Sequence, residues 1–153
     1  MKKLLRMLLC SMLVLAMLLP AAALADRLED RYNNAVALMA DGRYGEAADA
    51  FDALGVYEDA SMMAMYCRGM NMGAMGMYSI AADTMKHLGE YRDAPLFYTY
   101  YTALGYEAAE LYETAGTELN KVLYFRDSLA RVASYPEKIN ARDYRKEIGR
   151  AHV

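Results

Sequence analysis

Residues 44–59 read YGEAADAFDALGVYED, and variants of this segment follow at a constant interval, YSIAADTMKHLGEYRD at 78–93 and YETAGTELNKVLYFRD at 112–127. At this spacing five columns of related residues align. They are Tyr32, Tyr66 and Tyr100; Tyr44, Tyr78 and Tyr112; Ala47, Ala81 and Ala115; Phe51, Met85 and Leu119; and Asp59, Asp93 and Asp127. Self-similarity at a fixed period of this length indicates a structural repeat.

Apolar residues inside each unit have helical spacing. They step by three and four along three stripes: Tyr44, Ala47, Ala48, Phe51 and Leu54; Tyr78, Ala81, Ala82, Met85 and Leu88; and Tyr112, Ala115, Gly116, Leu119 and Val122. Another helical segment precedes each stripe, at 32–40, 61–72 and 94–104. Each unit is therefore predicted to be a pair of antiparallel helices, and the tyrosine that opens each second helix is expected to pack between units.

Turn residues separate the predicted helices. Gly42 and the segment 73–76 divide the first helix from the second, and Gly55 and Gly89 follow the second helix, where a left-handed residue often ends a helix. The corresponding loop of the third copy lacks this glycine. The aspartates of the fifth column stand where an N-cap is expected, and such a cap is worth about 1 kcal/mol.

These signals predict an all-α solenoid, because helix pairs of this size must stack on neighbours to cover their apolar stripes. The expected units run over about 26–58, 59–92 and 93–126. The first helix of a fourth unit follows at 127–135. Tyr135-Pro136 is expected to end that helix, and 136–147 to form a short tail.

A family resemblance supports this arrangement. The segment 42–51 fits the pattern GxYxEAxxxF and resembles the second-helix signature of tetratricopeptide repeats, which share the 34-residue period. Ala35, Gly69 and Ala103 lie where that family has a small first-helix residue that lets the two helices approach. The resemblance covers 26–135, although the chain has no tryptophan and carries the loop aspartate in place of the family's late proline.

The resemblance implies that the first helices line a concave groove for peptides. It places six side chains on that strip, and they form the predicted peptide-binding site: Tyr32, Tyr66, Tyr100, Met63, Phe97 and Met70. Tyrosine and methionine suit an apolar or aromatic peptide segment. The alternative is that the tyrosine column closes the packing between helices.

The first 25 residues have the pattern of a secretion signal. Lys2, Lys3 and Arg6 precede an apolar run at 8–19, and Ala23-Leu24-Ala25 provides a small-x-small cleavage site. Cleavage before Asp26 is expected, with an uncleaved anchor as the alternative. The predicted location is extracytoplasmic, with no stable membrane span after cleavage, because the apolar run is short of the roughly 20 residues that a spanning helix needs.

Charge and composition argue against several functions. Cleavage would leave 14 basic and 20 acidic residues, a net charge of −6, where a nucleic-acid binder would carry a basic face. The mature chain holds one cysteine, Cys67, and no serine–histidine pattern typical of a catalytic triad. His87 is better explained as a cation near a helix end. We therefore expect no enzyme activity, no nucleic-acid partner and no cofactor.

Seven methionines between residues 62 and 77 raise a minor alternative, because thioether sulfur is a soft ligand for Cu(I). Methionine in an adaptable core or groove explains the same cluster.

The sequence thus favours an exported, non-enzymatic repeat scaffold that binds a protein or peptide through its first-helix face. One alternative is that the repeats are the adaptor region of a truncated, larger extracytoplasmic protein whose effector or catalytic domain is missing. This alternative arises because residues 148–153 match one reading frame of a widely used sequencing adapter and are expected to be an artefact.

Overall fold

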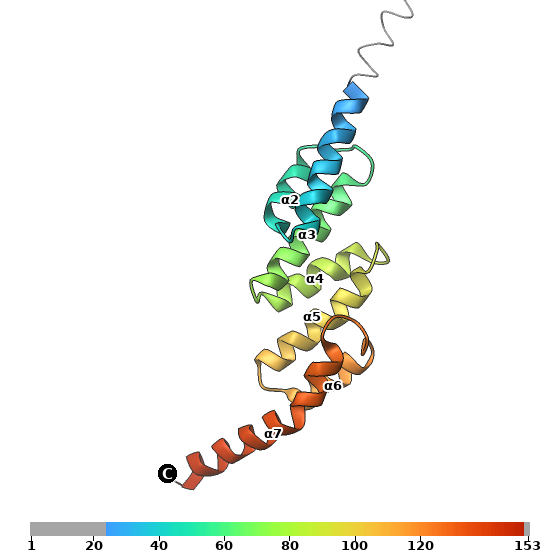
Figure 1. Cartoon of the computed structure of the whole chain (residues 1–153). Helices are drawn as coiled ribbons and strands as arrows, with labels where there is room; N and C mark the ends of the chain where they lie inside the picture. The colour runs from blue at the N-terminus through green and yellow to red at the C-terminus, as the bar shows by residue number, and fades with distance from the viewer. Residues whose placement is uncertain (1–23, 152–153) are drawn as a thin grey trace, which may run out of the picture. The chain divides into compact units, whose positions relative to one another are not determined.

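The computed structural model describes residues 24–151, and every regular element in that range is a helix (Figure 1). The first helix covers residues 24–40. The helices after it are α2 (Tyr44–Asp52), α3 (Ala60–Ala74), α4 (Tyr78–Leu88), α5 (Ala94–Ala108), α6 (Tyr112–Asn120) and α7 (Ser128–Ala151). The predicted all-α fold is confirmed. Residues 1–23, which hold most of the predicted signal, lie outside the described range.

Two compact units divide the chain, with their boundary between Ala64 and Met65 inside α3. The first unit contains the helix at 24–40, α2 and the start of α3. In the second unit α4 packs on α5, α5 on α6, and α6 on α7. Packing of each helix on the next along the chain is the arrangement of a helical solenoid, as the repeat predicts.

A repeated backbone turn ends the first helix of each pair. The N–H groups of Gly42 and Arg43 donate to the carbonyl groups of Met39 and Leu38, and the same two bonds recur in the second and third copies. The residue in left-handed conformation is Gly42, Gly76 or Glu110, with φ of 76°, 77° and 58°. The bonds satisfy carbonyl groups that the helix end would otherwise leave unpaired.

The loop that joins consecutive pairs is also repeated. Each copy contains two successive backbone hydrogen bonds between residues three apart. In the first copy the N–H of Tyr57 donates to the Leu54 carbonyl oxygen, and the N–H of Ala60 donates to the Tyr57 carbonyl oxygen. The third copy keeps these bonds without the glycine, through Phe125 and Ser128. The expected glycines do have positive φ, 61° at Gly55 and 59° at Gly89.

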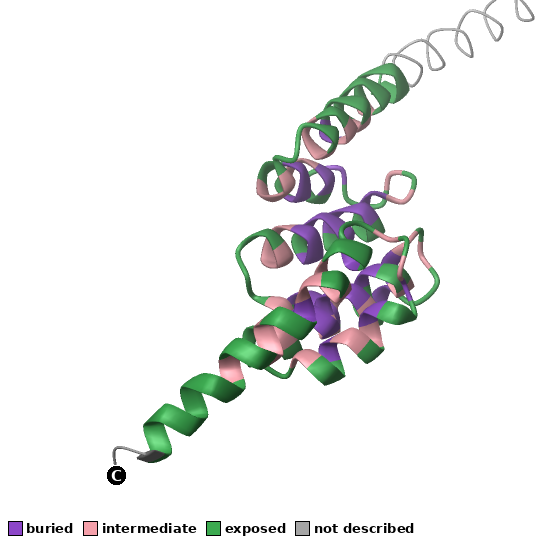
Figure 2. Ribbon diagram, turned by 60° about the horizontal axis from the view of Figure 1, so that its bottom comes forward, coloured by how far each residue is buried: buried purple, intermediate pink, exposed green. Residues whose placement is uncertain are grey.

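The buried faces of the helices follow the repeat columns (Figure 2). Two second-helix columns are fully buried, Ala47, Ala81 and Ala115 with Phe51, Met85 and Leu119, whereas the tyrosines that open these helices are partly exposed. Gly69 leaves room for the end of the Met85 side chain, because an added Cβ would lie 2.6 Å from the Met85 methyl carbon. Burial of each larger apolar side chain stabilises the fold by roughly 1.5–3 kcal/mol.

Helix α7 differs from the prediction. It continues through Pro136 to Ala151, so the expected helix end at Tyr135-Pro136 is wrong, and the segment predicted as a short tail, 136–147, is helical. Proline inside a helix removes one hydrogen bond and normally ends or bends the helix. Here ion pairs beyond the proline hold the helix, because Lys138 binds Glu107 and Arg142 binds Glu113. From residue 143 onward the helix is exposed.

Candidate functional site

The six residues predicted to bind a peptide belong mainly to the core. Tyr66, Tyr100, Met63, Phe97 and Met70 are each at most 8% exposed, and Tyr32 is half-buried. The structure brings Tyr66 and Phe97 together, with ring centroids 6.0 Å apart. Tyr32 packs on Phe51 instead. Such burial leaves little side-chain surface for a peptide, so we do not retain these residues as contact residues.

The first-helix tyrosines instead bind the loop aspartates. The hydroxyl groups of Tyr32, Tyr66 and Tyr100 donate to Oδ1 of the aspartate 27 residues later, at 2.6 Å between Tyr100 and Asp127. Burial, and then the bond to Asp127, raise the pKa of Tyr100 to about 12. The column aspartates therefore tie the loop between repeats to the first helix of the preceding pair.

The predicted capping role of these aspartates is wrong at Asp93. Asp93 is the N-cap residue of α5, but its side chain makes no capping bond. Its carboxylate accepts the hydrogen bond of the buried Tyr66 hydroxyl instead. A buried hydroxyl without a partner is costly, which favours this use of the carboxylate.

A column of loop aromatic residues, which the sequence analysis missed, completes the arrangement. The rings of Tyr57, Tyr91 and Phe125 pack edge-on against the column tyrosines, at centroid distances of 5.9, 6.3 and 5.8 Å. The spacing of the repeat could have revealed this column. We call each set of column tyrosine, loop aspartate and loop aromatic residue a loop clamp.

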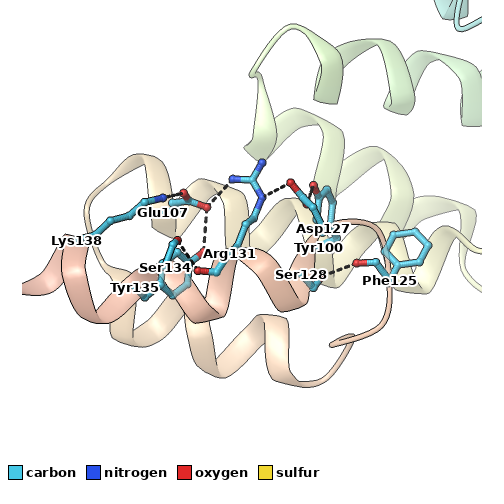
Figure 3. Close-up of polar contacts among 9 residues, drawn as sticks. All are labelled: Tyr100, Glu107, Phe125, Asp127, Ser128, Arg131, Ser134, Tyr135 and Lys138. Carbon is cyan, nitrogen blue, oxygen red and sulfur yellow. Dashed lines mark hydrogen bonds and ion pairs between the residues drawn. The ribbon is translucent and has the colours of Figure 1, made fainter.

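In α7 the predicted groove columns change from apolar to polar residues. Arg131, Ser134 and Lys138 lie one repeat period after Phe97, Tyr100 and Leu104. Figure 3 shows Arg131 and Lys138 on either side of Glu107, which projects from α5. The Glu107 carboxylate accepts bonds from Arg131 Nη1 at 2.8 Å, Lys138 Nζ at 2.6 Å and Tyr135 Oη at 2.9 Å.

This Glu107 cluster holds a carboxylate in its ionised form. Burial alone would raise the pKa of Glu107, but the bonds from Lys138, Arg131 and Tyr135 outweigh it and lower the pKa. Arg131 also binds Asp127 at 3.0 Å, which links the cluster to the third loop clamp. A carboxylate held by three donors is a poor proton acceptor near neutral pH, so the cluster acts as an anchor for α7.

Cysteine, histidine and methionine side chains show no common centre. Cys67 is buried, and burial raises the pKa of its thiol to about 11. Nδ1 of His87 lies 2.7 Å from the Asp83 carbonyl oxygen, near the end of α4. The methionines are divided between core and surface, with Met63 buried and Met75 exposed. Between residues 24 and 151 no group of three or more histidine, cysteine, aspartate or glutamate residues could hold a metal ion.

An exposed groove lies between α3 and α4, with a volume of about 490 Å³. It is lined by Met65, Arg68, Met72, Ile80, Asp83, Thr84 and His87. Met65 and Ile80 are 36% and 54% exposed, so apolar surface faces solvent there. All the lining residues belong to the second unit.

Comparison of the chain with protein-family models, with curated proteins and with solved structures gives no match. In the part of the chain that the structure describes, no helix has the length and apolar character needed to cross a membrane.

Proposed function

We propose that this chain is an exported, non-enzymatic helical-repeat scaffold that binds an apolar segment of a partner protein in the groove between α3 and α4. The observation that carries the proposal is the exposure of Met65 and Ile80 on facing helices of one groove. Contiguous apolar surface on a protein is a common sign of an interaction site. The resemblance to tetratricopeptide repeats favours the same class of function.

The chemistry of the groove suits a partner helix or extended segment with apolar anchors. Methionine side chains repack around varied shapes, so Met65 and Met72 can adapt to different anchors. Arg68 and His87 stand with Asp83 among the lining residues and offer polar contacts to the flanks of the segment. The rigid helices form the groove before the partner binds. Binding therefore loses little conformational entropy of this chain, which favours affinity.

The proposal that the chain is exported rests on the sequence pattern of residues 1–25, which has a basic start, an apolar run and a small-x-small cleavage site. The absence of a catalytic pattern in the sequence favours binding over catalysis.

A peptide library displayed on phage tests the binding proposal. We expect selection on the wild-type chain to enrich peptides with apolar residues at helical spacing, and Ile80→Glu to weaken their binding about tenfold or more, because a buried charge opposes apolar anchors. Leu96→Glu is the matched control, since Leu96 is 42% exposed on α5 and lies outside the groove. Equal losses in both variants, or selection of peptides without apolar residues, would contradict the proposal.

A further inference from the structure

A separate pocket lies between α4 and α5, with a volume of about 430 Å³. The side chains of Tyr98, Tyr101 and Tyr106 line it from α5, where they follow one another by three and five residues. Tyr98 and Tyr106 are each more than a third exposed, so their rings are accessible to a ligand. The pocket lies wholly within the second unit.

The only charged residue among those that line this pocket is Asp83 of α4. Asp83 is exposed, and its carboxylate makes no ion pair with any residue between 24 and 151. The other residues that line this pocket are tyrosine and uncharged smaller side chains, whereas Arg68 and His87 border Asp83 from the groove between α3 and α4. A single carboxylate beside aromatic rings is complementary to an organic cation, which gains both charge attraction and contact with ring faces.

Gly105 provides a second, independent observation. It lies inside α5, where glycine destabilises a helix relative to alanine. Packing does not require glycine there, because the nearest atom to an added Cβ would be the Tyr78 Cβ at 3.9 Å. This contrasts with Gly73, where an added Cβ would meet the Tyr101 ring at 2.3 Å. The missing side chain at Gly105 leaves space in the pocket.

From this geometry we propose that the pocket binds the positively charged side chain of a lysine or arginine residue on a partner protein. The alkyl stem of such a side chain lies along Tyr98 and Tyr106, and its charged end pairs with Asp83. Long basic side chains bury their stems and keep the charge at a polar rim in this way. The site is distinct from the groove between α3 and α4, although Asp83 borders both.

Titration with two small probes, followed by amide chemical shifts in NMR, tests this proposal. The probes are n-butylammonium chloride and 1-butanol, which share the alkyl chain and differ in charge. We expect the cation to bind about fivefold more tightly than the alcohol, as one exposed ion pair between the ammonium group and the Asp83 carboxylate would provide. The shifts should concentrate at residues 98–106 rather than at Met65 and Ile80.

Three variants test which groups of the pocket the two probes contact. Asp83→Asn should remove the preference for the cation, whereas Glu90→Gln, which removes an exposed charge outside the pocket, should keep it. Gly105→Leu should fill the pocket and abolish binding of both probes while α5 stays folded. Equal binding of the two probes, a preference that survives Asp83→Asn, or binding that survives Gly105→Leu would each overturn it.

Discussion

The hydroxyl group of each column tyrosine is partly buried and donates a hydrogen bond to a loop carboxylate, and this sets the residue-level chemistry of the repeat. A tyrosine ring at this position buries apolar area in the first helix, while its hydroxyl group still needs a polar partner. Asp59, Asp93 and Asp127 supply that partner from the following loop. The tyrosine side chain thus contributes to the core, and its hydrogen bond also fixes the position of the loop aspartate, which is the first residue of the next repeat.

Removal of one hydroxyl should measure the strength of a loop clamp. Tyr66→Phe keeps the ring but leaves the Asp93 carboxylate without its phenol donor, and we expect a loss of about 1.5–3 kcal/mol in the free energy of unfolding. Tyr98→Phe is the control, because Tyr98 is exposed and should change stability by less than about 0.5 kcal/mol. Denaturant unfolding of both variants provides the measurement. Equal effects would show that the bond to Asp93 contributes no more than a surface hydroxyl.

The residue before each loop aspartate carries backbone strain. Glu58, Arg92 and Arg126 have φ of 46°, 52° and 54°, a conformation that non-glycine residues rarely adopt. Arg92 and Arg126 also lie over the rings of Tyr66 and Phe97, at 5.7 and 4.9 Å from the centroids. These contacts offset part of the strain in the second and third copies.

Glycine at position 58 should therefore stabilise the chain. Glu58→Gly relieves roughly 1–2 kcal/mol of left-handed strain and loses part of that gain to the greater freedom of the unfolded chain, for a net gain of roughly 0.5–1 kcal/mol. Glu58→Ala removes the same exposed carboxylate and keeps the strain, so it should bring no gain. Thermal unfolding of the two variants distinguishes them. A matching gain for alanine would assign the effect to charge rather than to backbone conformation.

At the scale of elements, α7 is attached differently from the helices before it. Helix α5 buries a set of apolar residues that includes Phe97, Tyr101 and Leu104, whereas the buried residues described for α7 are Ser128 and Tyr135. Ion pairs from α7 to Glu107, Glu110 and Glu113 supply much of the remaining contact between α7 and the segments before it. Exposed ion pairs are weak and sensitive to salt, so attachment of α7 depends most on the partly buried Glu107 cluster.

Loss of the Glu107 charge should loosen α7 selectively. In Glu107→Gln we expect amide exchange in α7 to rise about tenfold, because a bond to a charged group is worth about 1.5 kcal/mol or more, while α4 should change little. Hydrogen-exchange mass spectrometry measures this difference. Glu118→Gln is the control, since Glu118 binds Lys121 at the surface of α6. A uniform rise across all helices would contradict a local anchoring role.

The same cluster predicts a pH dependence. The pKa of Glu107 is lower in the folded chain than in the unfolded chain, where it is about 4.3. Its stabilisation is therefore present above that unfolded value and is lost as the pH falls through the folded pKa. Protection of α7 in the wild-type chain should fall as the pH drops below about 4.3, after correction for intrinsic exchange. The Glu107→Gln variant should show a smaller fall, and an equal fall would exclude Glu107 as the titrating group.

Helix positions were predictable because their signals are local. Apolar spacing placed the starts of α2, α4 and α6 at Tyr44, Tyr78 and Tyr112, as observed, and glycine turns supported the first two. Pro136 misled the prediction because the contacts that hold α7 beyond it come from residues far away in the sequence, such as Glu107 and Glu113. A rule for local chain geometry cannot include such contacts.

For the whole molecule, the repeat period predicted helix pairs and the packing of each helix on the next that α4 to α7 show, but not the exposure of each column. Tyr66 and Tyr100 recur with the same period whether they face a groove or the core, and the structure buries both. Their burial and their hydrogen bonds to the loop aspartates favour the core interpretation, and the sequence showed both columns without the bond between them. The exposed lining residue Ile80 lay outside the strongest columns and was therefore missed as a candidate contact.

Export provides the last prediction at the scale of the whole chain. Cleavage before Asp26 would remove Leu24 and Ala25, both exposed, from the helix at 24–40 and leave the buried Ala35 in place. Asp26 would then lie in the first turn, where a carboxylate interacts favourably with the helix dipole. We therefore expect the chain exported from a bacterial host to begin at Asp26, by intact-mass analysis, and to keep the helical content and thermal stability of a chain expressed from Asp26 directly. A chain that retains residues 1–25 in the membrane fraction would instead support the uncleaved anchor.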